Sequence, residues 1–384
     1  MPWRKSCAMD QRLGFITEHL SGELTMTELC EAYGVSRRVG YKWLARYASE
    51  GPVGLLDRSK APRSHGRATA EALVEKIVDL RRARPSWGPR KIIAKLAARH
   101  PELCWPSHST AHEILKREGL VTARRVRRRP PLRPGDLIVP ERPNQVWAVD
   151  HKGWVSLGDG QRCEPLTLAD GYSRFLLALS AGRSTREAEA RPVLERAFDT
   201  YGLPEVIRSD NGPPFASASP TGLTALSVWW IKLAIHPERI KPGRPQENGR
   251  LERFHRTLLE AMRPAAADRQ AQAQRFEAFR HDYNHERPHQ ALGQLAPASF
   301  YTASVRAMPS RLPEPDYSAH LKIRRVRTNG EIKLGGALVP ISSALAGEAV
   351  ALEEIERGWR VWFYKEPIGL LDHKGQKLLP IQPG

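Results

Sequence analysis

Residues 144–155 have the sequence NQVWAVDHKGWV, in which apolar and polar residues alternate. This alternation, together with the β-branched and aromatic side chains, predicts a β-strand. Asp150 lies inside that strand. Burying a carboxylate at such a position costs free energy unless the carboxylate is paired or bound to a metal ion. Asp150 is therefore the first candidate site residue.

The chain downstream of this strand predicts an α/β domain. We expect a β-hairpin over residues 163–181, an amphipathic helix over 184–202, and a short strand over 203–212 that leads into Asp210. Three strands, a helix and a fourth strand are the layout of a ribonuclease H-like domain, in which the first and fourth strands lie side by side. Asp150 and Asp210 should therefore be neighbours.

Two neighbouring carboxylates repel each other, and this repulsion raises the pKa of one of them unless a cation lies between them. Carboxylate oxygens favour Mg²⁺ or Mn²⁺ over zinc. Two such ions about 4 Å apart can activate an attacking hydroxyl and stabilise a leaving oxygen. The pair of Asp150 and Asp210 thus indicates phosphodiester chemistry.

A third acid is expected from a later helix over residues 244–262, which offers Glu247 and Glu252. Glu252 lies at the edge of an apolar stripe that begins with Leu251, where it could face a cleft beside the sheet. Glu247 lies near the helix start, where a carboxylate favours the positive end of the helix dipole. The two are about 140° apart around a helix, so only one is expected to reach the aspartates.

Five segments, in order along the chain, resemble the integrase-core transposases of bacterial insertion sequences, which are relatives of the retroviral integrases. They are WAVDHKGW, LTLADGYSRF, RSDNGPPF, PGRPQENGRLERFHRTL and HDYNHERPHQALGQLAPASFY. The resemblance covers about residues 25–305 and implies a DDE transposase with Asp150, Asp210 and Glu252 as catalytic and metal-binding acids. Two Mg²⁺ or Mn²⁺ ions are then expected. The family's PQ-NG segment precedes its third acid by a few residues, which favours Glu252 over Glu247.

The spacing of the last two acids departs from the retroviral pattern. Forty-one residues separate Asp210 from Glu252, more than in the retroviral integrases. We expect the extra length in the polar loop 216–223, because surface loops tolerate insertions at little cost in free energy.

Residues 9–60 predict a helix-turn-helix DNA-binding domain. Thr25 or Thr27 can cap a first helix, Gly34 can end it in a left-handed conformation, and Ser36 can cap the second helix. Two helices joined by a tight glycine turn are typical of this motif, although a plain helical hairpin has the same pattern. Four residues early on the second helix are the candidate DNA contacts: Arg37, Arg38, Tyr41 and Lys42.

Residues 68–122 predict a second helix-turn-helix or winged-helix domain. A helix capped near Ser107 and ended by Gly119 follows an amphipathic helix that starts near residue 88. Arg90 and Lys91 are the candidate DNA contacts of this domain. A helical bundle that does not touch DNA is the alternative.

A basic, proline-rich linker is expected over residues 123–139, because a run of arginines cannot bury itself. Its candidate DNA contacts are Arg124, Arg125, Arg127 and Arg128. The chain of 384 residues contains 60 Lys and Arg against 42 Asp and Glu, which gives a net charge of +18. This charge favours nucleic acid as the partner, although an arginine-rich proteome would also produce a basic protein.

The complete fold is therefore expected to be multidomain. All-α helix-turn-helix modules precede a ribonuclease H-like α/β integrase core over residues 140–305. A small SH3-like β-barrel is expected over residues 318–384, with turns at 328–330, 334–336 and 356–358.

Several residues near the acids need separate interpretation. Asp170 is expected to shape the hairpin turn, and His151 to point to the opposite face of its strand from Asp150. The segment YNHERPHQAL, residues 283–292, is expected to close the core domain. Three basic residues near Glu252 are candidate DNA contacts: Lys241, Arg244 and Arg256.

The cysteine content is typical of a reducing cytosol, and the family resemblance implies a bacterial, nucleoid-associated protein. The four cysteines form no CxxC pair, which disfavours a zinc site or a disulfide framework. The N-terminus lacks the apolar run of a signal peptide, and no run of about 20 apolar residues predicts a membrane span.

Together these features predict a DNA transposase that acts on double-stranded DNA, both the terminal inverted repeats of its element and the target DNA. Joining two ends implies a homo-oligomer, at least a dimer on DNA. A catalytically silent DNA-binding regulator derived from a transposase is one alternative, and the intact acid trio disfavours it. A ribonuclease H-type nuclease is another, and the two DNA-reading modules disfavour it.

Overall fold

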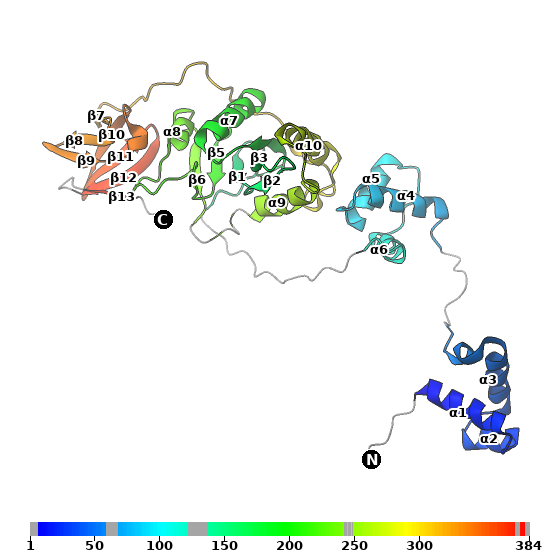
Figure 1. Cartoon of the computed structure of the whole chain (residues 1–384). Coiled ribbons are helices and arrows are strands. Elements are labelled where there is room, and N and C mark those ends of the chain that lie inside the picture. The colour runs from blue at the N-terminus through cyan, green and yellow to red at the C-terminus, as the bar shows by residue number, and fades with distance from the viewer. Residues whose placement is uncertain are drawn as a thin grey trace, which may run out of the picture. The chain divides into compact units, whose positions relative to one another are not determined.

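The computed structural model describes residues 7–58, 68–121, 137–241, 244, 247, 249–372 and 377–380. The chain divides into two compact units, Met1–Thr69 and Ala70–Gly384, and each is considered by itself. Figure 1 shows the elements of both units in chain order. Four candidate DNA contacts of the linker lie outside the described residues: Arg124, Arg125, Arg127 and Arg128.

The first unit is helical, as predicted. Thr25 begins the second helix through a capping box with Glu28, and Ser36 begins the third by accepting a hydrogen bond from the Val39 amide. Between these two helices Gly34 has a φ of 63°, a left-handed conformation that glycine adopts without steric cost. The elements are α1 (Ala8–Ser21), α2 (Met26–Ala32), α3 (Arg37–Glu50) and the 3-10 helix η1 (Gly51–Leu55).

Close packing at one glycine holds this unit together. Phe15 of α1 and Cys30 of α2 are buried against Gly40 of α3. A Cβ atom at Gly40 would lie 2.9 Å from both Cys30 Sγ and Phe15 Cζ, closer than real contacts allow. The glycine therefore lets α3 approach the other two helices.

Three further helices open the second unit. Pro89 occupies the first turn of the middle one, and Ser107 begins the last by accepting from the Thr110 amide. Trp87 and Leu115 lie in the apolar core between them. The helices are α4 (Glu71–Ala83), α5 (Pro89–Arg99) and α6 (His108–Arg117).

A six-stranded mixed sheet forms the centre of the second unit. Its strands have the order β2-β3-β1-β5-β6, with β4 paired to β3. β1 is antiparallel to β3 and parallel to β5, so the predicted pairing of the first strand with the strand before Asp210 is confirmed. The strands are β1 (Val146–His151), β2 (Val155–Ser156), β3 (Arg162–Asp170), β4 (Leu176–Gly182), β5 (Val206–Ser209) and β6 (His236–Arg239).

Helices cover both faces of this sheet (Figure 1). Trp147 and Val149 of β1 belong to one apolar cluster with α7 and α8, whereas Ala148 packs against a second cluster with α9 and α10. This alternation follows from the two-residue period of a strand. The helices are α7 (Glu187–Tyr201), α8 (Ala225–Lys232), α9 (Gly249–Ala261), α10 (Arg269–His281), the π-helical turn η3 (Asp282–Glu286), η4 (Gln290–Leu292) and η5 (Pro297–Phe300).

The C-terminal strands form an open sheet, so the predicted small barrel is not confirmed. Five strands have the order β13-β12-β11-β10-β7, and β8 pairs only with β9 in a separate hairpin. Among the described residues no hydrogen-bonded pairing closes these strands into a ring. The elements are β7 (Lys322–Arg325), β8 (Glu331–Leu334), β9 (Ala337–Pro340), η6 (Ser343–Leu345), β10 (Ala349–Ile355), β11 (Gly358–Phe363), β12 (Glu366–Asp372) and β13 (Leu378–Leu379).

The predicted turn at residues 328–330 forms, since the Gly330 amide donates to the Arg327 carbonyl and the Arg327 amide donates to the Glu331 carbonyl. The carbonyl of Gly330 accepts hydrogen bonds from the amides of Ile341 and Ser342, and β7 pairs with β10. β7 thus finds its strand partner in β10, beyond this turn. The turns at 334–336 and 356–358 do connect paired strands, as predicted.

α8 joins the core sheet to the C-terminal sheet. Trp230 packs in the core cluster, and Ile231 packs in the cluster of the C-terminal strands. Two polar contacts accompany this packing, Lys232 with Glu348 at 2.7 Å and His236 with Glu366 at 2.8 Å. Throughout the described residues, no helix is both long and apolar enough to span a membrane.

Candidate active site

Asp150 and Asp210 lie at the ends of neighbouring parallel strands. Ala148 of β1 is paired with Arg208 of β5, and each aspartate follows two residues later along its strand direction. The parallel register therefore brings the two carboxylates to the same level of the sheet. In agreement, the negative charge of Asp210 raises the pKa of Asp150.

α9 covers the face of β1 that carries Asp150. Leu251, Phe254 and Leu258 bury one side of this helix against the sheet. Glu252 lies at the edge of that buried stripe, where it is half-buried. Its charge also raises the pKa of Asp150, so both other predicted acids act on Asp150 electrostatically.

The pKa of Asp150 is raised to about 7. Burial is the largest cause, and the charge of Asp210 is the next, with a smaller contribution from Glu252. A hydrogen bond from the His151 backbone and the charge of Lys152 act in the opposite direction. Strongly shifted acids of this kind are concentrated at functional sites, because a site built to bind a cation holds its carboxylates close together.

The chemistry of this donor set fits a divalent cation. The three side chains offer only oxygen ligands, which Mg²⁺ and Mn²⁺ prefer, and a cation would relieve the repulsion acting on Asp150. Within the described residues, however, no three His, Cys, Asp or Glu side chains are arranged as a metal-binding cluster.

Glu247 makes its contacts within the loop before α9. Its carboxylate accepts a hydrogen bond from the Lys241 amide at 2.8 Å and lies 3.5 Å from the Arg244 guanidinium. It precedes Gly249, the first residue of α9. These contacts give Glu247 a structural role in the loop, in line with the choice of Glu252 as the third acid.

Asp170 and His151 also take the structural roles expected of them. Asp170 is only 1% exposed, and its carboxylate accepts hydrogen bonds from Ser173 and from the Asn144 amide. His151 stacks on Phe215, with ring centroids 5.7 Å apart. Phe215 belongs to the cluster on the α7 and α8 side, so His151 points away from the acids.

His255 is a residue that the sequence interpretation missed. It lies one turn after Glu252 on α9, and its Nδ1 atom is 3.7 Å from Asp150 Oδ2. Its Nε2 atom is 2.9 Å from the hydroxyl of Thr167 on β3. Burial lowers the pKa of His255 to about 3, so the imidazole is neutral and its contact with Asp150 is not an ion pair.

Most of the described candidate DNA contacts outside the acids are exposed. All four candidates on α3 are exposed, and so are Arg90, Arg244 and Arg256. Lys91 and Lys241 are half-buried. Their contact with DNA remains a prediction.

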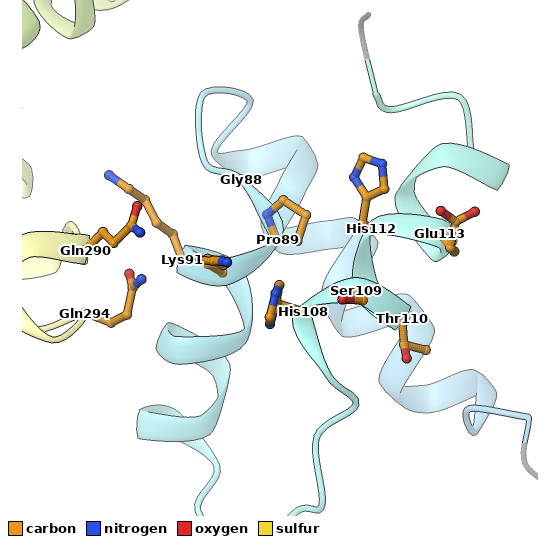
Figure 2. Close-up of a pocket in the computed structure, with 11 residues that line it drawn as sticks. Gly88, Pro89, Lys91, His108, Ser109, Thr110, His112, Glu113, Gln290 and Gln294 are labelled. Atoms are coloured by element: carbon orange, nitrogen blue, oxygen red, sulfur yellow. The ribbon is translucent and has the colours of Figure 1, made fainter. Parts of the chain in front are cut away.

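The first turns of α5 and α6 line a cavity of about 800 Å³, which Gln290 and Gln294 also border (Figure 2). Arg90 and Lys91 contribute its positive side chains. Helix N-termini carry partial positive charge, and basic side chains beside them favour an anion such as phosphate.

Residues 283–292 contact both the core sheet and α5, in keeping with the structural role predicted for them. The side-chain amide of Asn284 exchanges two hydrogen bonds with the backbone of Leu176 on β4. Glu286 pairs with Lys95 and Arg99 of α5 at 2.7 and 2.9 Å. The segment thus links the sheet with the helices that precede it.

Comparison with protein families identifies the parts of the chain. Residues 140–245 and 233–297 match families described as integrase core domain. Residues 11–63 match a helix-turn-helix domain, and residues 39–115 match a homeodomain-like domain.

Related proteins come from bacteria and from retroviruses. The insertion element IS407 uncharacterized 31.7 kDa protein of Burkholderia multivorans is 29% identical over 236 residues, 60% of this chain and 80% of that protein. The insertion element IS476 uncharacterized 39.2 kDa protein of Xanthomonas euvesicatoria is 27% identical, over 60% of this chain and 64% of that protein. The Gag-Pol polyprotein of baboon endogenous virus is 35% identical over 97 residues, which are only 5% of its length.

Among solved structures, the HTLV-2 integrase catalytic core domain in complex with magnesium is 15% identical, with a TM-score of 0.31. The match covers 42% of this chain and 99% of that one.

Proposed function

Because the chain carries the integrase core and helix-turn-helix domains found in proteins of bacterial insertion elements, we propose that it is a DNA transposase. It would bind the ends of its element, cleave a phosphodiester bond there, and join the freed 3′-hydroxyl to target DNA. The attacking groups are water and then DNA, so no covalent bond between protein and DNA is needed.

The observation that carries this proposal is the level placement of Asp150 and Asp210 on two parallel strands, beneath the helix that carries Glu252. A buried carboxylate that faces two further negative charges is unfavourable in a folded protein unless the site binds a cation. Asp150 and Asp210 would share divalent ions, and Glu252 would complete the second position. Bound Mg²⁺ or Mn²⁺ would supply Lewis-acid stabilisation of the phosphodiester oxygens.

The other residues named in this proposal would bind DNA. The exposed Arg37, Arg38, Tyr41 and Lys42 on α3 would contact the terminal repeat, as residues early on a recognition helix do. The cavity with Arg90 and Lys91 would hold a backbone phosphate. The linker arginines, Lys241, Arg244 and Arg256 would add further contacts, in keeping with the net charge of +18.

The same proposal includes the limits of the domains and the oligomeric state of the protein on DNA. The DNA-binding domains would span residues 9–60 and 68–122, the linker 123–139, the catalytic core 140–305 and the C-terminal β domain 318–384. Two element ends must be held together, so the active form would be at least a dimer on DNA. The protein would act in the bacterial cytoplasm, on the nucleoid.

A coupled assay with labelled element-end DNA, a target plasmid and Mn²⁺ tests the proposal. Cleavage at the element end followed by joining to the plasmid supports it. End binding without any cleavage would instead identify a DNA-binding regulator. Cleavage without joining would identify a ribonuclease H-type nuclease.

A further inference from the structure

His255 connects the three elements that surround the acids. It is 6% exposed on α9, where its neighbours are mostly the apolar residues of the second core cluster. A polar side chain in such surroundings costs free energy unless its polar atoms have partners. Both ring nitrogens of His255 point to polar groups, Thr167 on β3 and Asp150 on β1.

The geometry assigns the proton of this imidazole. The Thr167 hydroxyl donates its single hydrogen to the backbone carbonyl of Asp150, at 2.9 Å. The same hydroxyl oxygen lies 2.9 Å from His255 Nε2, and with its hydrogen on the carbonyl it accepts a hydrogen bond from Nε2–H. The neutral ring then has an unprotonated Nδ1, whose lone pair faces the Asp150 carboxylate.

We propose that His255 is a positioning residue for the acid site, a proposal that rests on the proposed function of that site. Through Thr167 it fixes the backbone of Asp150 relative to α9, the helix that carries Glu252. Through Nδ1 it places a second electron-rich atom beside Asp150 Oδ2. Two such atoms side by side favour a cation between or next to them, and the hydrogen bond from Thr167 to the Asp150 backbone is an outer contact that holds a metal ligand in place.

Three variants of the full chain test the proposal. His255→Phe keeps a planar ring in apolar surroundings but removes both nitrogens. Thr167→Val keeps the shape of the Thr167 side chain but removes the hydroxyl that links the ring to Asp150. His255→Gln keeps an N–H donor near the position of Nε2 and serves as the conservative replacement.

The principal measurement is Mn²⁺ affinity by titration calorimetry, which does not depend on catalysis. We expect His255→Phe and Thr167→Val each to weaken Mn²⁺ binding about 10–100-fold, the range found when outer partners of metal ligands are removed. His255→Gln should recover most of the affinity. The double variant His255→Phe/Thr167→Val should be no weaker than the weaker single variant, because both act through one contact.

A matched control is Thr257→Ala, on the same helix. Among the described residues, the Thr257 hydroxyl donates to the Arg253 carbonyl within α9 and to no other group, so this variant should bind Mn²⁺ as the wild type does. The far-UV circular dichroism spectrum should match that of the wild type in every variant, which excludes a general loss of fold.

The ¹⁵N spectrum of histidine-labelled protein gives a second, metal-free readout. We expect His255 as the neutral Nε2–H tautomer in the wild type and a mixture of tautomers in Thr167→Val. An Nδ1–H tautomer in the wild type overturns the inference, and so does unchanged Mn²⁺ affinity in both His255→Phe and Thr167→Val. If the wild-type chain binds no Mn²⁺, the proposed function fails, and the tautomer alone then decides the inference.

Discussion

Asp150 and Asp210 lie level with each other on two parallel strands, and the charge of Asp210 raises the pKa of Asp150. The fold itself therefore creates an unfavourable charge arrangement at the end of β1. Such an arrangement is a stability cost that a bound cation can offset. Several measurable consequences depend on it.

The first prediction concerns stability without metal. Asp150→Asn should increase the free energy of unfolding at pH 8 in EDTA by on the order of 1–4 kcal/mol, because it removes a charge whose pKa is about 7 in the folded chain against 3.8 ordinarily. The same variant should lose all cleavage and joining. Urea unfolding measured by circular dichroism checks the stability.

The pH dependence gives the control for this prediction. The pKa of Asp150 is raised by folding, so its contribution favours the folded chain at low pH and is lost as pH rises through about 7. The advantage of Asp150→Asn should therefore be full above pH 7 and should disappear toward pH 4. An advantage that stays constant over this range would show that burial of Asp150 is not its source.

The second prediction concerns metal binding. Mn²⁺ at about 100 times its dissociation constant should raise the free energy of unfolding of the wild type by about 2.7 kcal/mol. Because Mn²⁺ competes with the proton on Asp150, its affinity should fall about tenfold per pH unit below pH 7. Thermal unfolding with and without Mn²⁺ at several pH values measures both effects, and a pH-independent affinity would contradict the account.

The third prediction separates the two glutamates. Glu252→Gln should abolish strand transfer, because it removes a carboxylate that acts on Asp150. Glu247→Gln should retain activity within a few-fold, because an amide oxygen can still accept the Lys241 N–H. Each substitution replaces one carboxylate oxygen with an amide nitrogen. An equal loss of strand transfer in both variants would therefore refute the assignment of Glu252 as the third acid.

Much of this site could be predicted from local patterns. The alternation around Trp147 and Val149 indicated a strand with Asp150 on one face, and that face is the one that α9 covers. The edge of the α9 stripe indicated Glu252. Both inferences use periodicity, which depends only on neighbours in sequence.

The features that were missed depend on distant partners. His255 follows the buried Phe254, and nothing in its neighbouring sequence indicates a role at the site. Its partners Thr167 and Asp150 lie on strands that are distant from it in the sequence. β6 contains Pro237 and charged residues, and it forms only because it pairs with β5 at the edge of the sheet. The open C-terminal sheet likewise depends on the pairing of β7 with β10 across more than twenty residues.

The fourth prediction concerns DNA binding by α3. Arg37→Ala and Arg38→Ala should each weaken binding to element-end DNA, and removing one arginine–phosphate interaction should reduce the slope of log K against log salt by about 1. Arg196→Ala, an exposed arginine of α7, is the control. Fluorescence anisotropy from 50 to 200 mM salt measures the slopes, and equal slopes in all variants would show that α3 does not contact the DNA backbone.

The most direct test of the central claim is strand transfer by Asp210→Asn. Purified wild type and variant are incubated with pre-cleaved element-end DNA, a target plasmid and Mn²⁺, and joined products are counted by sequencing. The account predicts wild-type affinity for the end DNA and no joined product from the variant. Joining by Asp210→Asn at the wild-type rate would contradict it.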